Sequence, residues 1–231
     1  MLEALIFDVD GTLAETEELH RRAFNETFAA AGLGWHWSRD DYTALLTTTG
    51  GKERMARYVT EQGGDLGALP LAALHADKTA RYVALMAGGA MALRPGIAEL
   101  IAGARVAGLK LAVATTTSPE NVDALCRAVF GQAAGRVFDV IAAGDMVAAK
   151  KPAPDVYLLA LQRLGVAPQR AVALEDSRNG LRAALAAGLP CLVSPGVYTV
   201  AEDFTGAAAV MPCFTELGGL AGITARLPQG A

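Results

Sequence analysis

Two aspartates separated by one residue follow the first apolar run of the chain. Leu5-Ile6-Phe7 comes before Asp8, and Asp10-Gly11-Thr12 follows one residue later. The apolar run predicts a buried strand that the glycine ends. In open α/β sheets, ligands bind at the carboxyl ends of the strands. A polar loop would account for a single aspartate, whereas this pair predicts a carboxylate nucleophile beside an acid–base group, both close to a metal ion.

Two further polar segments follow predicted strands. Thr115-Thr116-Thr117-Ser118-Pro119 comes after the apolar run at 110–114, and a serine followed by proline is a typical helix start. A hydroxyl group and free helix amides there would bind an oxyanion. Lys150-Lys151-Pro152 follows the predicted strand at 138–142. We expect the proline to open a helix, so that one of the two lysines extends over the sheet edge.

Two adjacent acids, Glu175 and Asp176, end the apolar run at 171–174. Buried acids in that position are costly unless a cation or strong donors neutralise them. If the strands that end near Asp8, Thr115 and Glu175 are neighbours in a parallel sheet, four carboxylates and one lysine share a pocket. Carboxylate and carbonyl oxygens suit Mg²⁺, so we predict that Asp8, Asp10, Glu175 and Asp176 form a magnesium site.

The elements around these residues predict an α/β protein with an insertion. Residues 15–88 contain helical patterns only, beginning with a helix that Thr16 caps, while strand patterns occur on both sides. We therefore predict an α/β core domain at 1–14 and 89–231 and an α-helical cap domain at 15–88. Hinges are expected near Ala14–Thr16 and Gly88–Gly89. The tail beyond Leu220 is expected to be loosely ordered.

Several polar residues of the insertion are candidates for binding a substrate. Glu17 and His20 share one helix face, although a solvated face would also explain them. Thr49-Gly50-Gly51-Lys52-Glu53-Arg54 combines flexible glycines, a helix start and two cations, which favours a phosphate or carboxylate group over an ordinary interhelical turn. His75 and Lys78 lie three residues apart and would add to this site, or form a surface pair.

Composition limits the partners and the compartment. The chain has 231 residues, 52% of them apolar, and a net charge of −4, which favours neither nucleic acid nor an anionic membrane. Cys126, Cys191 and Cys213 lie in apolar surroundings and predict buried reduced thiols. We see neither a signal peptide nor an apolar run of membrane-spanning length. We expect a cytoplasmic monomer whose partner is a small molecule.

The order of these motifs resembles that of the haloacid dehalogenase superfamily. Asp8-x-Asp10-Gly11-Thr12, Thr115, Lys151-Pro152 and Glu175-Asp176 match its four motifs without departure. The resemblance implies a doubly wound, Rossmann-like parallel sheet with a small α-helical cap, and a phosphoaspartyl intermediate. An acid two residues beyond the nucleophile argues against dehalogenation, which expels a halide and needs no such group.

The resemblance also implies a role for each of these residues. Asp8 attacks phosphorus, while Asp10 protonates the leaving oxygen and later deprotonates the hydrolytic water. Thr115 and Lys151 hold the phosphoryl oxygens.

The resemblance further implies a set of Mg²⁺ ligands. The carboxylate of Asp8, the main-chain carbonyl of Asp10 and the carboxylate of Asp176 bind the ion, with Glu175 in support. We expect Asp10 to be less acidic than Asp8, because Asp8 is on the metal and the side chain of Asp10 faces neighbouring acids.

Within the superfamily, the segments Glu17-x-x-His20 and Thr49 to Arg54 are similar to those of xylulose-1,5-bisphosphate phosphatases from CO₂-fixing organisms, which remove a Rubisco inhibitor and yield xylulose 5-phosphate. This resemblance implies substrate contacts in the cap, and we expect further contacts from Thr116, Thr117 and Asn121. A β-phosphoglucomutase-type sugar phosphomutase and another small-molecule phosphatase, such as phosphoglycolate phosphatase, remain open. So does a phosphorylatable, receiver-like switch, although a switch needs no lid over its aspartate.

Overall fold

The centre of the molecule is a sheet of parallel strands. The computed structural model describes residues 1–89 and 91–227. Within them the strand order is β3-β2-β1-β4-β5-β6, and every pairing is parallel. The strands are β1 (Ala4–Phe7), β2 (Lys110–Thr115), β3 (Val140–Ala143), β4 (Ala171–Glu175), β5 (Cys191–Val193) and β6 (Ala209–Val210). The predicted α/β class with a doubly wound parallel sheet is confirmed.

The first strand lies in the middle of this sheet. Phe7, its last residue, pairs with Val113 of β2 on one side and with Leu174 of β4 on the other. The strands that end near Asp8, Thr115 and Glu175 are therefore neighbours, as the sequence predicted. Because parallel strands end at the same edge, their polar residues converge there.

Helices cover both faces of the sheet. Successive side chains of a strand point to opposite faces, so Leu5 and Phe7 enter one apolar cluster and Ala4 and Ile6 enter another. The helices that cover the face of the first cluster are α5 (Ile97–Val106), α6 (Pro119–Phe130), α7 (Ala134–Val137) and α10 (Leu220–Arg226), and Ala23, Tyr82 and Met86 of the helical segment between β1 and α5 join the same cluster. The helices that cover the face of the second cluster are α8 (Asp155–Leu164) and α9 (Arg178–Ala186).

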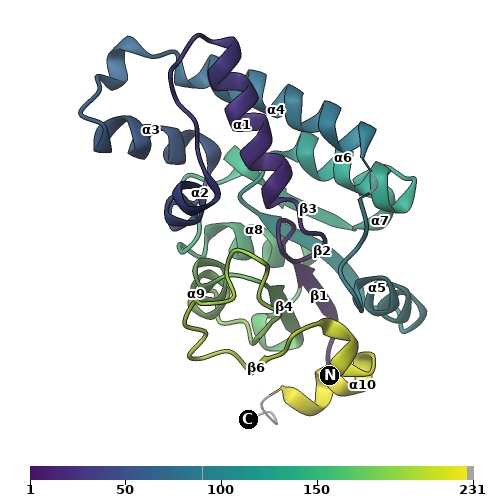
Figure 1. Ribbon diagram of the computed structural model, residues 1–231. Helices are drawn as coiled ribbons and strands as arrows, with labels where there is room; N and C mark the ends of the chain where they lie inside the picture. Colours follow the sequence, from purple (N-terminus) through teal and green to yellow (C-terminus); the bar gives the residue numbers. More distant parts are fainter. Residues whose placement is uncertain (90, 228–231) are drawn as a thin grey trace.

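The described chain between β1 and α5 is helical. It contains α1 (Glu17–Ala30), α2 (Arg39–Leu46), α3 (Gly51–Glu61), a short 3-10 helix at Leu66–Ala68, and α4 (Leu71–Gly88). A third apolar cluster, which includes Phe24, Trp37 and Tyr42, holds these helices together. Figure 1 shows them gathered at the end of the molecule opposite the two termini. None of the described helices is both long and apolar enough to cross a membrane.

Two local predictions are wrong. Pro152 does not open a helix, because Ala153 precedes a second proline and is disfavoured in helical conformation, so α8 begins only at Asp155. The segment beyond Leu220 is not loosely ordered as far as it is described, since it forms α10. Leu220, Ile223 and Leu227 have helical spacing and pack onto the first apolar cluster. The expected tail at 228–231 lies outside the described residues.

Arg94 fastens the chain where it returns to the sheet. Its main-chain N–H donates to Leu13 at 2.8 Å, and its guanidinium lies 3.2 Å from the Glu15 carboxylate. The same guanidinium donates to the carbonyls of Ser194 and Pro195 at 2.7 and 2.8 Å, and to that of Gly11. Arg94 thus joins the connection before α1 and the connection before α5 to the loop after β5.

Gly96, at the start of α5, needs both a left-handed backbone and close packing. Its φ is +93°, and an added Cβ would lie 2.4 Å from the carbonyl carbon of Phe214. Gly108 has a similar φ of +73° but nothing within 4 Å of such a Cβ. We predict that Gly96→Ala lowers the free energy of unfolding by roughly 2–4 kcal/mol, against about 1 kcal/mol for Gly108→Ala. Urea denaturation of both variants tests this prediction, and an equal loss of unfolding free energy in the two variants would contradict it.

Candidate active site

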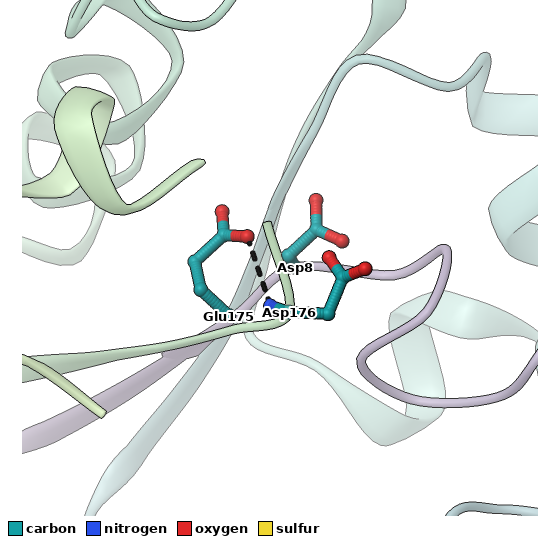
Figure 2. Close-up of side chains that lie close together, drawn as sticks. All are labelled: Asp8, Glu175 and Asp176. Atoms are coloured by element: carbon teal, nitrogen blue, oxygen red, sulfur yellow. Dashed lines mark hydrogen bonds between the residues drawn. The ribbon is translucent and has the colours of Figure 1, made fainter. Parts of the chain in front are cut away.

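Three buried carboxylates lie close together at the carboxyl edge of the sheet, and one ammonium pairs with two of them. Lys151 Nζ donates to Asp8 Oδ1 and to Glu175 Oε1, each at 2.6 Å. Tyr157 also donates its hydroxyl to Glu175 Oε1, at 2.6 Å. Figure 2 shows Asp8 at the end of β1 facing Glu175 and Asp176 at the end of β4. Of the two lysines that the sequence offered, the structure brings Lys151 to the nucleophile candidate.

The charges of this cluster do not balance. One carboxylate oxygen from each of Asp8, Glu175 and Asp176 lies within 4.8 Å of the others. Burial raises the pKa of Asp8 to about 8, with Glu175 adding to the rise and Lys151 opposing it. Burial also raises the pKa of Asp176 well above its usual value, and the charges of Asp8 and Glu175 add to this. Closely spaced hard oxygens with excess negative charge fit a divalent cation such as Mg²⁺.

Asp10 is held by the helical segment. Thr16 donates its hydroxyl to Asp10 Oδ1 at 2.5 Å, and His20 Nε2 lies 2.9 Å from the same oxygen. Behind the imidazole, Lys78 Nζ lies 2.6 Å from His20 Nδ1. The expected cap by Thr16 is wrong in detail. The residue has the N-cap position of α1 but makes no side-chain cap, because the carboxylate is a stronger acceptor for its hydroxyl.

This environment reverses the expected order of acidity between the two aspartates in the chain without metal. Burial alone would raise the pKa of Asp10, but His20, the Thr16 hydroxyl and Lys78 lower it to about 2. The pKa of Asp8 is about 8. One ground of the expectation, that Asp10 faces neighbouring acids, is wrong, because Thr16, His20 and Lys78 surround its carboxylate instead. The other ground, a metal ion at Asp8, stays a prediction.

One pocket collects most of the predicted site residues. It opens between the carboxyl edge of the sheet and the helices α1, α3 and α4. The predicted residues that line it are Asp8, Asp10, Glu17, His20, Thr49, Gly50, Gly51, Arg54, His75, Lys78, Thr115, Thr116, Thr117, Asn121, Lys151 and Asp176. Glu175 is fully buried behind the pocket and contacts it through Lys151.

Lys52 does not line this pocket. Its Nζ lies 2.5 Å from Asp145 Oδ2, and Lys150 binds the other oxygen of that carboxylate at 2.7 Å. These three residues line an adjacent cavity instead. The first turn of α3 points Lys52 and Arg54 in different directions, so only the guanidinium reaches the pocket.

Sequence reasoning missed several polar residues of the site. Ser177 and Asn179 line the pocket, and their position directly after the paired acids was a usable signal. Thr199 also lines it and donates its hydroxyl to the main-chain carbonyl of Asp176 at 2.7 Å. This threonine lies in the loop after β5, and no local pattern marked it.

Comparison with known proteins fits this geometry. The family model of the haloacid dehalogenase-like hydrolases matches residues 2–188. Protein CbbY of Cereibacter sphaeroides is 66% identical over 228 residues, which are 99% of each chain. A crystal structure of CbbY from Rhodobacter sphaeroides in complex with phosphate has a TM-score of 0.95 and 67% identity, covering 97% of this chain and 100% of that one.

A second crystal structure of that CbbY holds a sugar bisphosphate. It is an Asp→Asn variant in complex with xylulose 1,5-bisphosphate, with a TM-score of 0.94 and 67% identity, covering 96% of this chain and 99% of that one. The chain described here belongs to the haloacid dehalogenase-like hydrolases. Within that family it is a phosphatase.

The buried Lys78 should cost stability. Burial lowers its pKa from 10.5 to about 7, although Asp10 opposes this shift. Between these two values the unfolded chain binds a proton that the folded chain has released, so stability rises with pH across that window. We predict that Lys78→Met raises the free energy of unfolding at pH 7 by on the order of 1–4 kcal/mol, weakens this pH dependence and lowers activity. Urea denaturation of the wild-type protein and the variant from pH 6 to 10 measures both free energies of unfolding. A variant less stable than the wild type would contradict the prediction.

Proposed function

We propose that the protein is a Mg²⁺-dependent sugar-phosphate phosphatase that forms a phosphoaspartyl intermediate on Asp8. Its proposed reaction converts xylulose 1,5-bisphosphate and water to xylulose 5-phosphate and phosphate, which removes an inhibitor of Rubisco. The observation that carries the proposal is the meeting of Asp8, Asp10 and Lys151 in one pocket. It is supported by 67% identity to the CbbY structure that holds this bisphosphate.

The first chemical step transfers the phosphoryl group to the protein. A carboxylate oxygen of Asp8 forms a bond to phosphorus, the ester bond to the sugar oxygen breaks, and Asp10 gives a proton to that oxygen. The negative charge of the bound substrate favours the protonated form of Asp10, which its neighbours in the protein alone disfavour. Lys151 and Thr115 bind the phosphoryl oxygens during the transfer. Thr115 lies at the end of β2, is buried and lines the same pocket as Asp8.

The second step returns the carboxylate. A water molecule forms a bond to phosphorus, the bond between phosphorus and the Asp8 oxygen breaks, and Asp10 accepts a proton from the water. Inorganic phosphate then leaves. His20 and Thr16 hold the Asp10 carboxylate in one orientation for both proton transfers.

The residues of the acidic cluster would hold the Mg²⁺ ion. We assign as ligands the carboxylates of Asp8 and Asp176 and the main-chain carbonyl of Asp10, with Glu175 in support through Lys151. Bound there, the ion would neutralise the carboxylates and stabilise the charge of the transferring group. Thr199 orients Asp176 for this role, because its hydroxyl contacts both the main-chain carbonyl and, at 3.2 Å, Oδ2 of that residue.

The helical segment would grip the rest of the substrate. We assign residues 15–88 to a cap domain and 1–14 with 89–231 to the core; positions 90 and 228–231 lie outside the described residues. The segment has its own apolar cluster and lines one side of the pocket. The turn at Thr49-Gly50-Gly51 and the guanidinium of Arg54 would bind the phosphate that does not react. Cap closure about the two connections would exclude bulk water.

Incubation of the purified protein with Mg²⁺ and a panel of sugar phosphates tests the reaction. We predict stoichiometric phosphate release, fastest from xylulose 1,5-bisphosphate, and a loss of roughly a thousandfold or more in kcat for Asp8→Asn. Asp40→Asn, an exposed position on α2, is the matched control and should leave turnover unchanged. An isomerised sugar phosphate would instead identify a mutase, and hydrolysis of phosphoglycolate alone would reject the sugar assignment.

Removal of divalent metal tests the acidic cluster. We predict that EDTA abolishes turnover and that Mg²⁺ restores it. Because the ion relieves repulsion among buried carboxylates, saturating Mg²⁺ at about 100 times its Kd should also stabilise the fold by about 2.7 kcal/mol. Asp176→Asn should weaken this Mg²⁺-dependent stabilisation, measured by thermal unfolding. Full activity after exhaustive chelation would contradict the metal assignment.

A further inference from the structure

An acid and a guanidinium line the same wall of the pocket without pairing to each other. Glu17 lies at the start of α1 and Arg54 in the first turn of α3, and both reach the pocket. The described chain contains no ion pair between them. Opposite charges attract each other at short range in a protein, so the absence of an ion pair between these two residues calls for a physical reason.

The hydroxyl of Tyr42 occupies the position between them. It donates to Glu17 Oε2 at 2.6 Å and accepts from Arg54 Nη1 at 2.8 Å. Arg54 also lies over the tyrosine ring, with its guanidinium carbon 5.0 Å from the ring centre. Tyr42 is fully buried and is not among the residues that line the pocket. It therefore acts on a ligand only through its two neighbours.

The ring of Tyr42 is fixed by aromatic packing. Its centre lies 6.3 Å from that of Phe24, 6.2 Å from that of Trp37 and 5.7 Å from that of Tyr198. Burial raises the pKa of Tyr42 well above its usual value, with Arg54 opposing and Glu17 adding to the rise, so the hydroxyl keeps its proton for Glu17. A fixed ring and a neutral hydroxyl together make a spacer of constant length.

The spacer leaves one polar atom of each neighbour available. In the described chain, Tyr42 binds Oε2 of Glu17 and Nη1 of Arg54, whereas no hydrogen bond is found to Oε1 of the acid or from Nη2 of the guanidinium. The two residues present a free carboxylate oxygen and a free N–H group to one pocket. An acceptor for a hydroxyl group beside a donor for an anion matches a polyhydroxylated substrate that carries a second anionic group.

We propose that Tyr42 is a positioning residue that sets substrate specificity by holding Glu17 and Arg54 apart. Glu17 then accepts a hydrogen bond from a sugar hydroxyl, and Arg54 binds the anionic group that does not react. This inference rests on the proposed function, because it assumes turnover of a sugar phosphate at Asp8. Without the tyrosine hydroxyl, the two side chains are free to pair with each other and the substrate must separate them.

The test compares Tyr42→Phe with the wild-type protein on two substrates. Xylulose 1,5-bisphosphate uses the whole pocket, whereas p-nitrophenyl phosphate has neither sugar hydroxyls nor a second anion. We expect KM for the bisphosphate to rise about tenfold or more, since hydrogen bonds to two charged groups are lost. The kcat/KM for p-nitrophenyl phosphate should stay within about twofold, because the groups around Asp8 are unchanged.

Tyr58→Phe is the matched control. Tyr58 belongs to the same aromatic region, with its ring centre 5.4 Å from those of Trp35 and Trp37, and it does not line the pocket. Tyr58→Phe should keep the wild-type KM for the bisphosphate and the wild-type kcat/KM for p-nitrophenyl phosphate. If Tyr58→Phe reproduced the effect of Tyr42→Phe, the change would come from aromatic packing and the inference would be wrong.

The remaining outcomes separate this inference from the proposed function. If Tyr42→Phe lost kcat/KM equally on both substrates, or left KM for the bisphosphate unchanged, the role of Tyr42 would be overturned. The phosphatase assignment would remain intact. If the wild-type protein hydrolyses p-nitrophenyl phosphate but no sugar phosphate in the panel, the proposed function fails and the inference falls with it. Thermal unfolding of both variants excludes a folding defect as the cause.

Discussion

The bridge that Lys151 makes between Asp8 and Glu175 is the interaction on which the site depends. One ammonium pairs with only two of the three buried carboxylates, so the carboxyl edge of the sheet holds more acidic groups than the protein itself neutralises. That arrangement is tolerable because neighbouring parallel strands present it at an edge where a cation and a substrate can enter.

The two aspartates are positioned by different parts of the chain. The sheet fixes Asp8, which directly follows the central strand, whereas α1 and α4 fix Asp10 through Thr16, His20 and Lys78. Movement of the helical segment therefore changes the surroundings of Asp10 more than those of Asp8. The stacking of His20 on Tyr82, with ring centres 4.0 Å apart, makes the imidazole part of the packing between α1 and α4. The proposed acid–base chemistry and the proposed enclosure of the substrate thus depend on the same helices.

The edge of the sheet could be predicted from the sequence because each polar motif directly follows an apolar run whose period and length indicate a buried strand. Asp8, Thr115 and Glu175 are of this kind. Contacts between distant elements could not be predicted in this way. In the sequence, Thr16 looks like a helix cap and Tyr42 looks like an aromatic residue of the core, so neither pattern indicates the residues that their hydroxyls contact. Lys52 carried the right charge, but its direction depends on Asp145, which lies 93 residues away in the chain. The helix α10 was missed although Leu220, Ile223 and the following Leu227 have helical spacing, because its glycine and small residues resembled a disordered tail.

Identification of the atom that receives the phosphoryl group tests the central claim most directly. The protein is mixed with Mg²⁺ and xylulose 1,5-bisphosphate, quenched with acid within milliseconds and digested with pepsin, and the peptides are sequenced by mass spectrometry. One acid-stable, hydroxylamine-sensitive phosphoryl group on Asp8 is the predicted result. A phosphoryl group on any other residue, or complete hydrolysis in a single turnover by Asp8→Asn, would contradict it.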